Sequence, residues 1–165
     1  MLCLDISLDL NLTTAELVLL GYAGLLHDLG KSRIPHQVLA KKSPLDRHEK
    51  EMMREHPRLG FLALLDPQYA AITSVIVAHH EFKRDPYPRQ GKERRRNQRA
   101  SAERRAPSAL MSNLAPIVAI ADMYDALASP RSYKPRFPLK HITETLAAQF
   151  TGPSSYIDSI VQRHA

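Results

Sequence analysis

Apolar residues recur at three- and four-residue spacing along most of the chain, and no stretch alternates cleanly over the length of a strand. This spacing is typical of amphipathic helices. We therefore predict an all-α fold, a compact helical bundle in a single domain spanning residues 1–165. Helices are predicted over residues 15–28, 47–65 with a bend or restart at Pro57, 66–82, 113–128 and 138–150, with a short last helix from Pro153.

Local signals mark where several of these helices begin. Thr13 or Thr14 can cap the first helix, and Asp46 followed by Glu49 resembles a capping box. Proline is favoured in the first turn of a helix, so we expect it to open the later helices at Pro67, Pro116, Pro138 and Pro153.

Positive charge is concentrated in one segment. The chain has 23 Lys+Arg and 17 Asp+Glu, a formal net charge of +6, and Lys83–Arg105 alone holds ten basic and three acidic residues. This segment is nearly devoid of apolar residues, so we expect an Arg-rich loop insertion over about 84–113. A solvated loop and a phosphate-attracting rim both fit it. Nucleic-acid binding ranks lower because stacking aromatic residues are missing.

Composition excludes several classes of protein. Cys3 is the single cysteine, which excludes an internal disulfide and a cysteine-cluster zinc site. No apolar run reaches the roughly 18 residues of a membrane span, and no leader peptide is recognisable. We therefore expect a cytoplasmic protein with no membrane contact.

Histidine and aspartate residues follow or interrupt apolar helical runs that belong in a core. They are His27, Asp28, His56, His79, His80 and Asp122. Buried charge is costly unless it is paired or bound to a metal, and imidazole with carboxylate but no thiolate suits Fe, Mn, Zn or Ni. Adjacent helical residues point about 100° apart, so His27 and Asp28 would reach two neighbouring ions, or one of the two residues would bridge them. The pattern favours a multinuclear site between facing helices.

Other polar residues are interpreted more conservatively. Lys31 emerges beside the proposed ions and can hold a phosphate oxygen as a point charge. Asp125, one turn after Asp122, is interpreted as a supporting carboxylate rather than a ligand. Four histidines are assigned ordinary packing or surface roles: His36, His48, His141 and His164.

Four strings, in this order, resemble the HD-GYP domain, a branch of the HD metal-dependent phosphohydrolases. They are HDLGK (27–31), HPRLG (56–60), HHE (79–81) and DMYDAL (122–127). HDxGK alone marks the wide HD superfamily, whereas the series followed by RSYK is much more specific. The resemblance covers about 17–150, apart from the basic insertion.

The resemblance implies an HD-type helical bundle that hydrolyses the bacterial second messenger cyclic di-GMP to pGpG or GMP. Two divalent ions, iron or else Mn, Ni or Zn, would activate a shared water. The implied metal ligands are His27, Asp28, His56, His79, His80 and Asp122. Asp28 would bridge the ions, and Lys31 would neutralise phosphate charge. The implied substrate contacts are Lys31, Tyr87, Arg131 and Lys134.

The chain departs from the family at three places. The family's glycine-rich turn, typically DGxGYP, is FKRDPYP here, one residue shorter and with Pro86 in place of the last glycine. Proline cannot adopt a positive φ, so the loop must have another shape. The segment Arg89–Leu114 is longer than usual. An earlier family helix that contributes a Glu and a His has no counterpart in MLCLDISLDLNLT, which favours two metal ions over three.

Alternatives remain open at the level of sequence. With an altered loop, the chain could be a degenerate HD-GYP-like module that binds cyclic di-GMP or a GGDEF-domain protein without hydrolysis. It could also be an HD hydrolase acting on another nucleotide, or an RNA binder through Arg94, Arg95 and Arg96. A homodimer, and action in trans or as a fragment of a longer sensor protein, are compatible with the chain.

Overall fold

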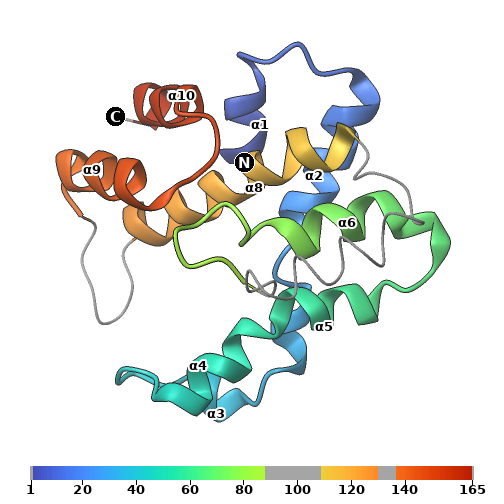
Figure 1. The fold of residues 1–165 in the computed structure, drawn as a ribbon, viewed down its shortest axis with the longest axis vertical. Helices are drawn as coiled ribbons and strands as arrows, with labels where there is room; N and C mark the ends of the chain where they lie inside the picture. The colour runs from blue at the N-terminus through green and yellow to red at the C-terminus, as the bar shows by residue number, and fades with distance from the viewer. Residues whose placement is uncertain (1, 88–108, 130–136, 165) are drawn as a thin grey trace.

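The computed structural model describes residues 2–87, 109–129 and 137–164. Within these ranges every regular element is a helix, and the β structure amounts to one isolated antiparallel bridge between Lys83 and Phe150. The prediction of an all-α fold is confirmed, and the helices pack together as a bundle (Figure 1). No helix of the described ranges has the length and apolarity needed to cross a membrane.

The elements follow one another along the chain with short connections. They are α1 (Leu2–Ser7), α2 (Thr14–Leu26), the 3₁₀ helix η1 (Leu29–Arg33), α3 (His36–Leu39), α4 (Arg47–Arg54), α5 (His56–Ala63), the 3₁₀ helix η2 (Pro67–Tyr69), α6 (Ala70–Ala78), α8 (Ala109–Ala128), α9 (Leu139–Gln149) and α10 (Ser155–His164). Most of the predicted Arg-rich loop lies outside the described residues.

Helix α8 forms the centre of the bundle. It packs against α1, α2, α6, α9 and α10, and it crosses the middle of the molecule in Figure 1. Residues 114–121 are buried without interruption. A helix that is buried all round belongs in the interior, and this one is apolar enough to lie there. The surrounding helices cover it with fully buried aliphatic side chains, among them Ile6, Leu20, Ile76, Ile142 and Ile160.

Two of the predicted helix starts have the expected capping boxes. The Thr13 side chain accepts from the backbone N–H of Glu16, whose own side chain accepts from the Thr13 N–H. Asp46 and Glu49 do the same at α4. Such reciprocal pairs satisfy two backbone donors that no helical carbonyl can reach.

Proline behaves as predicted at one helix and not at another. Pro138 is the N-cap of α9, as expected. The prediction that Pro116 opens a helix is wrong, because α8 begins at Ala109 and contains Pro116 in its interior. An interior proline loses one helical hydrogen bond. The uninterrupted burial of residues 114–121 offsets that loss.

Two helices end earlier than predicted, and both ends matter for the site. Helix α2 stops at Leu26 rather than at residue 28, and α6 stops at Ala78 rather than at residue 82. The chain then turns, with Lys31 N–H donating to the Asp28 carbonyl after α2. Between α4 and α5 the helix is interrupted at Glu55, so the predicted restart near Pro57 is confirmed.

A short N-terminal helix was not predicted. Helix α1 packs against α2, α8 and α10, and it contributes the buried side chains of Cys3 and Ile6 to the core. It carries Asp5 but neither glutamate nor histidine.

The turn after α2 lies directly on α5. A Cβ atom added at Gly30 would lie 1.9 Å from the His56 carbonyl oxygen and 2.5 Å from the Gly60 nitrogen. A side chain at position 30 would therefore separate η1 from α5. The glycine allows the two backbones to touch, which places His56 beside Asp28.

Candidate metal centre

Three histidines of the centre are held in the same way. His27, His56 and His79 each lie just past a helical turn. In each ring Nδ1 donates a hydrogen bond to the backbone carbonyl three residues earlier, those of Gly24, Met53 and Ile76. A carbonyl only accepts, so Nδ1 carries the proton and Nε2 of the neutral ring keeps a lone pair. Proteins orient histidine ligands for metals by this kind of contact.

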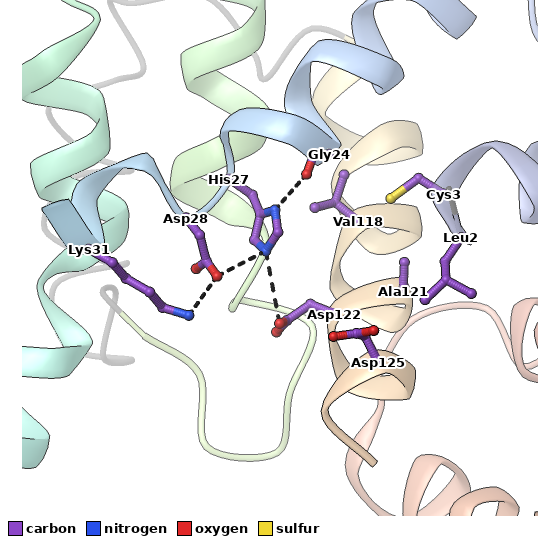
Figure 2. Close-up of a pocket in the computed structure, with 10 residues that line it drawn as sticks. All are labelled: Leu2, Cys3, Gly24, His27, Asp28, Lys31, Val118, Ala121, Asp122 and Asp125. Atoms are coloured by element: carbon purple, nitrogen blue, oxygen red, sulfur yellow. Dashed lines mark hydrogen bonds and ion pairs between the residues drawn. The ribbon is translucent and has the colours of Figure 1, made fainter. Parts of the chain in front are cut away.

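The Nε2 atoms are directed at two carboxylates and at one another. The Nε2 atom of His27 lies 3.4 Å from Asp28 Oδ2 and 3.9 Å from Asp122 Oδ1, as Figure 2 shows. The other carboxylate oxygen of Asp28, Oδ1, lies 3.3 Å from His56 Nε2. That nitrogen in turn lies 3.4 Å from His79 Nε2. The Asp28 carboxylate thus stands between His27 on one side and the pair His56 and His79 on the other.

His80 completes the cluster. His56, His79 and His80 are buried and each can offer a nitrogen within 4.8 Å of the others, a spacing compatible with one shared metal ion. The His79 and His80 rings lie 4.0 Å apart between centroids. His80 Nδ1 lies 3.9 Å from Asp122 Oδ2.

Burial keeps three of these imidazoles neutral. It lowers the pKa of His79 to about 3 and also lowers the pKa of His56 and His80. For His27, burial again lowers the pKa, but the Asp28 carboxylate and the Gly24 carbonyl outweigh it and raise the pKa above its ordinary value. Burial raises the pKa of Asp28, yet His27 and Lys31 hold it well below the usual range.

The donor set fits a divalent cation. Neither His56 nor His79 can donate through Nε2, so two lone pairs face each other across 3.4 Å. Within the described part of the chain, Asp28 Oδ1 and His80 Nδ1 are buried and have no hydrogen-bond partner. Buried polar atoms are nearly always satisfied, and a cation bound by imidazole and carboxylate would satisfy all of these.

A lysine pairs with each carboxylate of the centre. Lys31 Nζ donates to Asp28 Oδ2 at 2.6 Å (Figure 2), and Lys83 Nζ donates to Asp122 Oδ2 at 3.1 Å. Sequence reasoning singled out Lys31 but missed Lys83. Nothing in the local sequence marks Lys83, because the loop that carries it is positioned by its bridge to Phe150 far along the chain.

The altered loop after HHE places Tyr87 at the edge of the centre. The Tyr87 ring stacks on His80 with centroids 4.3 Å apart, and the Arg54 guanidinium lies 5.4 Å from the Tyr87 centroid. Arg54 also pairs with Asp85 of the same loop. The loop therefore keeps an aromatic ring beside the histidines although its glycines are missing.

Two cavities meet at this centre. One, of about 360 Å³, is lined by His27, Asp28 and Asp125 together with Leu2 and Cys3 of α1 (Figure 2). The other, of about 610 Å³, is lined by His56, His80 and Tyr87 and extends towards the loop after α3. Both cavities are lined by Lys31 and Asp122.

The six predicted ligands therefore come from separate parts of the chain and lie together. The two predicted contacts Lys31 and Tyr87 line the larger cavity. Arg131 and Lys134 lie outside the described residues.

Asp125 lines the smaller cavity and accepts a hydrogen bond from Ser129. The remaining histidines lie elsewhere: His36 and His48 are exposed, the His141 ring packs at a tilt against Phe137, and His164 pairs with Asp5.

Residues 1–127 match the HD domain family. The chain belongs to this family. Among relatives of the HD domain, the cyclic di-GMP phosphodiesterase response regulator RpfG of Xanthomonas campestris is 32% identical over 148 residues, covering 86% of this chain and 34% of the relative. A cyclic di-GMP phosphodiesterase of Vibrio cholerae is 36% identical over 135 residues, covering 76% and 24%. A 3′3′-cGAMP-specific phosphodiesterase 2 of Vibrio cholerae is 32% identical over 145 residues, covering 84% and 24%.

This HD domain thus spans about a third or less of the length of these relatives. The resemblance to the HD-GYP branch that the motifs carried is confirmed by the family match and by these names. HD-domain phosphohydrolases are metal-dependent, and the histidine cluster is the place in the described structure where a metal ion fits.

Proposed function

We propose that this HD domain is a metal-dependent phosphodiesterase that hydrolyses a cyclic dinucleotide, with cyclic di-GMP as the first substrate to test. The observation that carries the proposal is the convergence of four imidazoles and two carboxylates, with the Nε2 atoms of His27, His56 and His79 facing inward. The names of the relatives support the substrate class, because they include both cyclic di-GMP and 3′3′-cGAMP phosphodiesterases.

The arrangement of the donor atoms is compatible with two divalent ions, which would be iron or else Mn, Ni or Zn. Asp28 directs Oδ1 towards His56 and Oδ2 towards His27, so one carboxylate can serve both sides of the centre. His79 and His80 belong to the His56 side, and Asp122 lies within reach of His27. When bound, divalent ions would polarise the phosphate and lower the pKa of water towards neutrality.

The residues of the chain itself orient the substrate. Lys31 lines both cavities, and its ammonium group is positioned to contact a non-bridging phosphate oxygen once substrate enters. Burial raises the pKa of Tyr87, so its ring stays a neutral phenol with a face for stacking and a hydroxyl for hydrogen bonding. Arg131 and Lys134 remain proposed contacts.

A second substrate has specific support. A relative of 32% identity over 84% of the chain is named as specific for 3′3′-cGAMP, which also has two phosphodiester links. The contrasting proposal of a binding module without hydrolysis, acting on a GGDEF-domain partner, rests on the altered loop with Pro86.

The test is hydrolysis of cyclic di-GMP and 3′3′-cGAMP by protein purified without oxygen and loaded with Fe²⁺ or Mn²⁺. We expect turnover that is lost in the chelated protein and in Asp28→Ala, and retained in Asp158→Ala, whose aspartate lies exposed on α10. Binding without turnover by metal-loaded protein would favour the module. Failure to bind or hydrolyse either dinucleotide would contradict the proposal.

A further inference from the structure

The loop between α3 and α4 is fixed by the same carboxylate that caps α4. Glu49 Oε2 accepts from the backbone N–H of Asp46 at 2.8 Å and from Lys41 Nζ at 2.5 Å. The Lys41 side chain and the capping box together hold the pKa of Glu49 below its usual range. The loop is thereby tied at both of its ends to the start of α4.

Lys42 follows Lys41 in this loop, but it has no counter-ion within the loop. Lys31, Lys41 and Lys42 all line the larger cavity. Lys31 pairs with Asp28, and Lys41 pairs with Glu49. Within the described ranges Lys42 is exposed and forms no ion pair, so its ammonium group is available to a ligand.

The cavity joins this lysine to the proposed metal centre. At about 610 Å³ it is within the size range of ligand pockets. His56, His80 and Tyr87 of the proposed centre line it together with Lys42 and Ser43 of the loop after α3. Apolar side chains also line the cavity, namely Val38, Leu39, Leu45 and Met53.

We propose that the loop end of this cavity is a subsite for the second phosphate of a cyclic dinucleotide, with Lys42 as its cation. The inference rests on the proposed function and extends it. A cyclic dinucleotide carries two phosphates on opposite sides of one ring, so only one can be at the metal centre beside Lys31. The other phosphate then needs a cation away from the histidines, and Lys42 is the lysine of this cavity without a paired carboxylate.

The test compares a cyclic substrate that carries two phosphates with a substrate that has a single phosphodiester. Steady-state kinetics of the metal-loaded protein are measured with cyclic di-GMP and with bis(p-nitrophenyl) phosphate. For Lys42→Gln we expect KM for cyclic di-GMP to rise about tenfold, in line with the loss of one partly exposed charge-assisted contact. We expect kcat for cyclic di-GMP and both constants for the single diester to stay unchanged.

Lys50→Gln is the matched control, since Lys50 is an exposed lysine of α4 that does not line the cavity. Equal KM values for the two variants, or an equal rise with both substrates, would overturn the subsite. If the wild-type protein turns over only the single diester, the proposed function fails on its own. Calorimetric binding of cyclic di-GMP then decides the subsite: a weaker Kd in Lys42→Gln alone supports it, and equal or undetectable binding overturns it.

Discussion

At the scale of single residues, each anchored histidine does two things with one ring. Nδ1 of His27, His56 and His79 satisfies a carbonyl at the end of a helical turn, and Nε2 is thereby turned into the centre. Carbonyls at helix C-termini have no helical partner and carry partial negative charge, so these anchors also favour a cation nearby. Three separate turns have the same short-range geometry.

The metal-free protein should lose stability in mild acid. Burial lowers the pKa of His79 to about 3, and lowers those of His56 and His80, whereas the unfolded chain has ordinary values near 6.5. Unfolding therefore takes up protons below about pH 6.5, so this contribution is complete above that pH and is lost as pH falls. His27 has a raised pKa, so its contribution has the opposite sign and grows as pH falls towards 6.5, and the effect of the three neutral rings is therefore read below pH 6.5.

Urea denaturation in chelator at pH 7.5, 6.5 and 5.5 measures this effect. The free energy of unfolding should fall towards pH 5.5, with a slope of up to about 1.4 kcal/mol per pH unit for each proton taken up. A free energy that is constant or rises between pH 6.5 and 5.5 would show that these rings are not buried as neutral groups.

At the scale of elements, the contact between η1 and α5 sets the geometry of the centre. For Gly30→Ala we expect a loss of about 1–3 kcal/mol or more in the free energy of unfolding, because the new Cβ would meet backbone at 1.9 Å. The separation of η1 from α5 should also weaken metal binding. Chemical denaturation and metal titration measure the two effects.

Gly60→Ala is the matched control on the other side of the same contact. Its added Cβ would meet its nearest atoms at 3.4 Å, a tight but ordinary contact. Alanine also favours a helix over glycine by about 1 kcal/mol, so the change in stability should be small. If the two variants lose stability equally, the close approach at Gly30 is not what positions α5.

The loop of residues 81–87 is held by the far end of the chain as well as by its neighbours. Arg84 N–H donates to the Gln149 carbonyl at 2.9 Å, and Thr151 N–H donates to the Phe82 carbonyl at 3.0 Å. These bonds place Lys83 beside Asp122. Its ammonium group there forms an ion pair with a carboxylate that we propose as a metal ligand.

Removal of this charge should strengthen metal binding. For Lys83→Met we expect Kd for Mn²⁺ to fall several-fold, because a half-buried pair of this kind contributes up to about 1 kcal/mol. Calorimetric titration measures it, with Lys140→Met on the exposed face of α9 as the control. Unchanged or weaker binding in Lys83→Met alone would mean that Lys83 supports the site instead of competing for it.

The sequence predicted helix boundaries correctly where the signal for them was local. The caps at Thr13 and Asp46 and the restart after Glu55 depend on residues within one turn. The start of α8 was misjudged, because tertiary burial overrides the local preference of Pro116. The positions of Lys83 and Lys42 were not foreseen, since each depends on contacts that the local sequence does not encode. The proposed ligands could be named because the order of the four family strings carries them.

At the scale of the whole molecule, the bundle and the centre are partly independent. The core around α8 is formed mainly by aliphatic side chains that α8 shares with α1, α2, α6, α9 and α10. We therefore expect the chelated protein and Asp28→Ala to remain folded. Added Mn²⁺ should stabilise the wild-type protein by about 2.7 kcal/mol at a hundredfold excess over Kd, because it binds the folded state.

Thermal melting with and without Mn²⁺ measures that coupling. Asp28→Ala should show a smaller metal-dependent rise in Tm, whereas Asp158→Ala should match the wild-type protein. Equal rises in all three proteins would place the stabilising ion somewhere other than the histidine cluster.

The most direct test of the centre is the metal content of the protein purified without oxygen, determined by elemental analysis against protein concentration. We expect about two transition-metal ions per chain in the wild-type protein and a large loss of metal in folded Asp28→Ala. A folded wild-type protein that retains no ion, and binds none when Fe²⁺, Mn²⁺, Ni²⁺ and Zn²⁺ are each supplied, would contradict it.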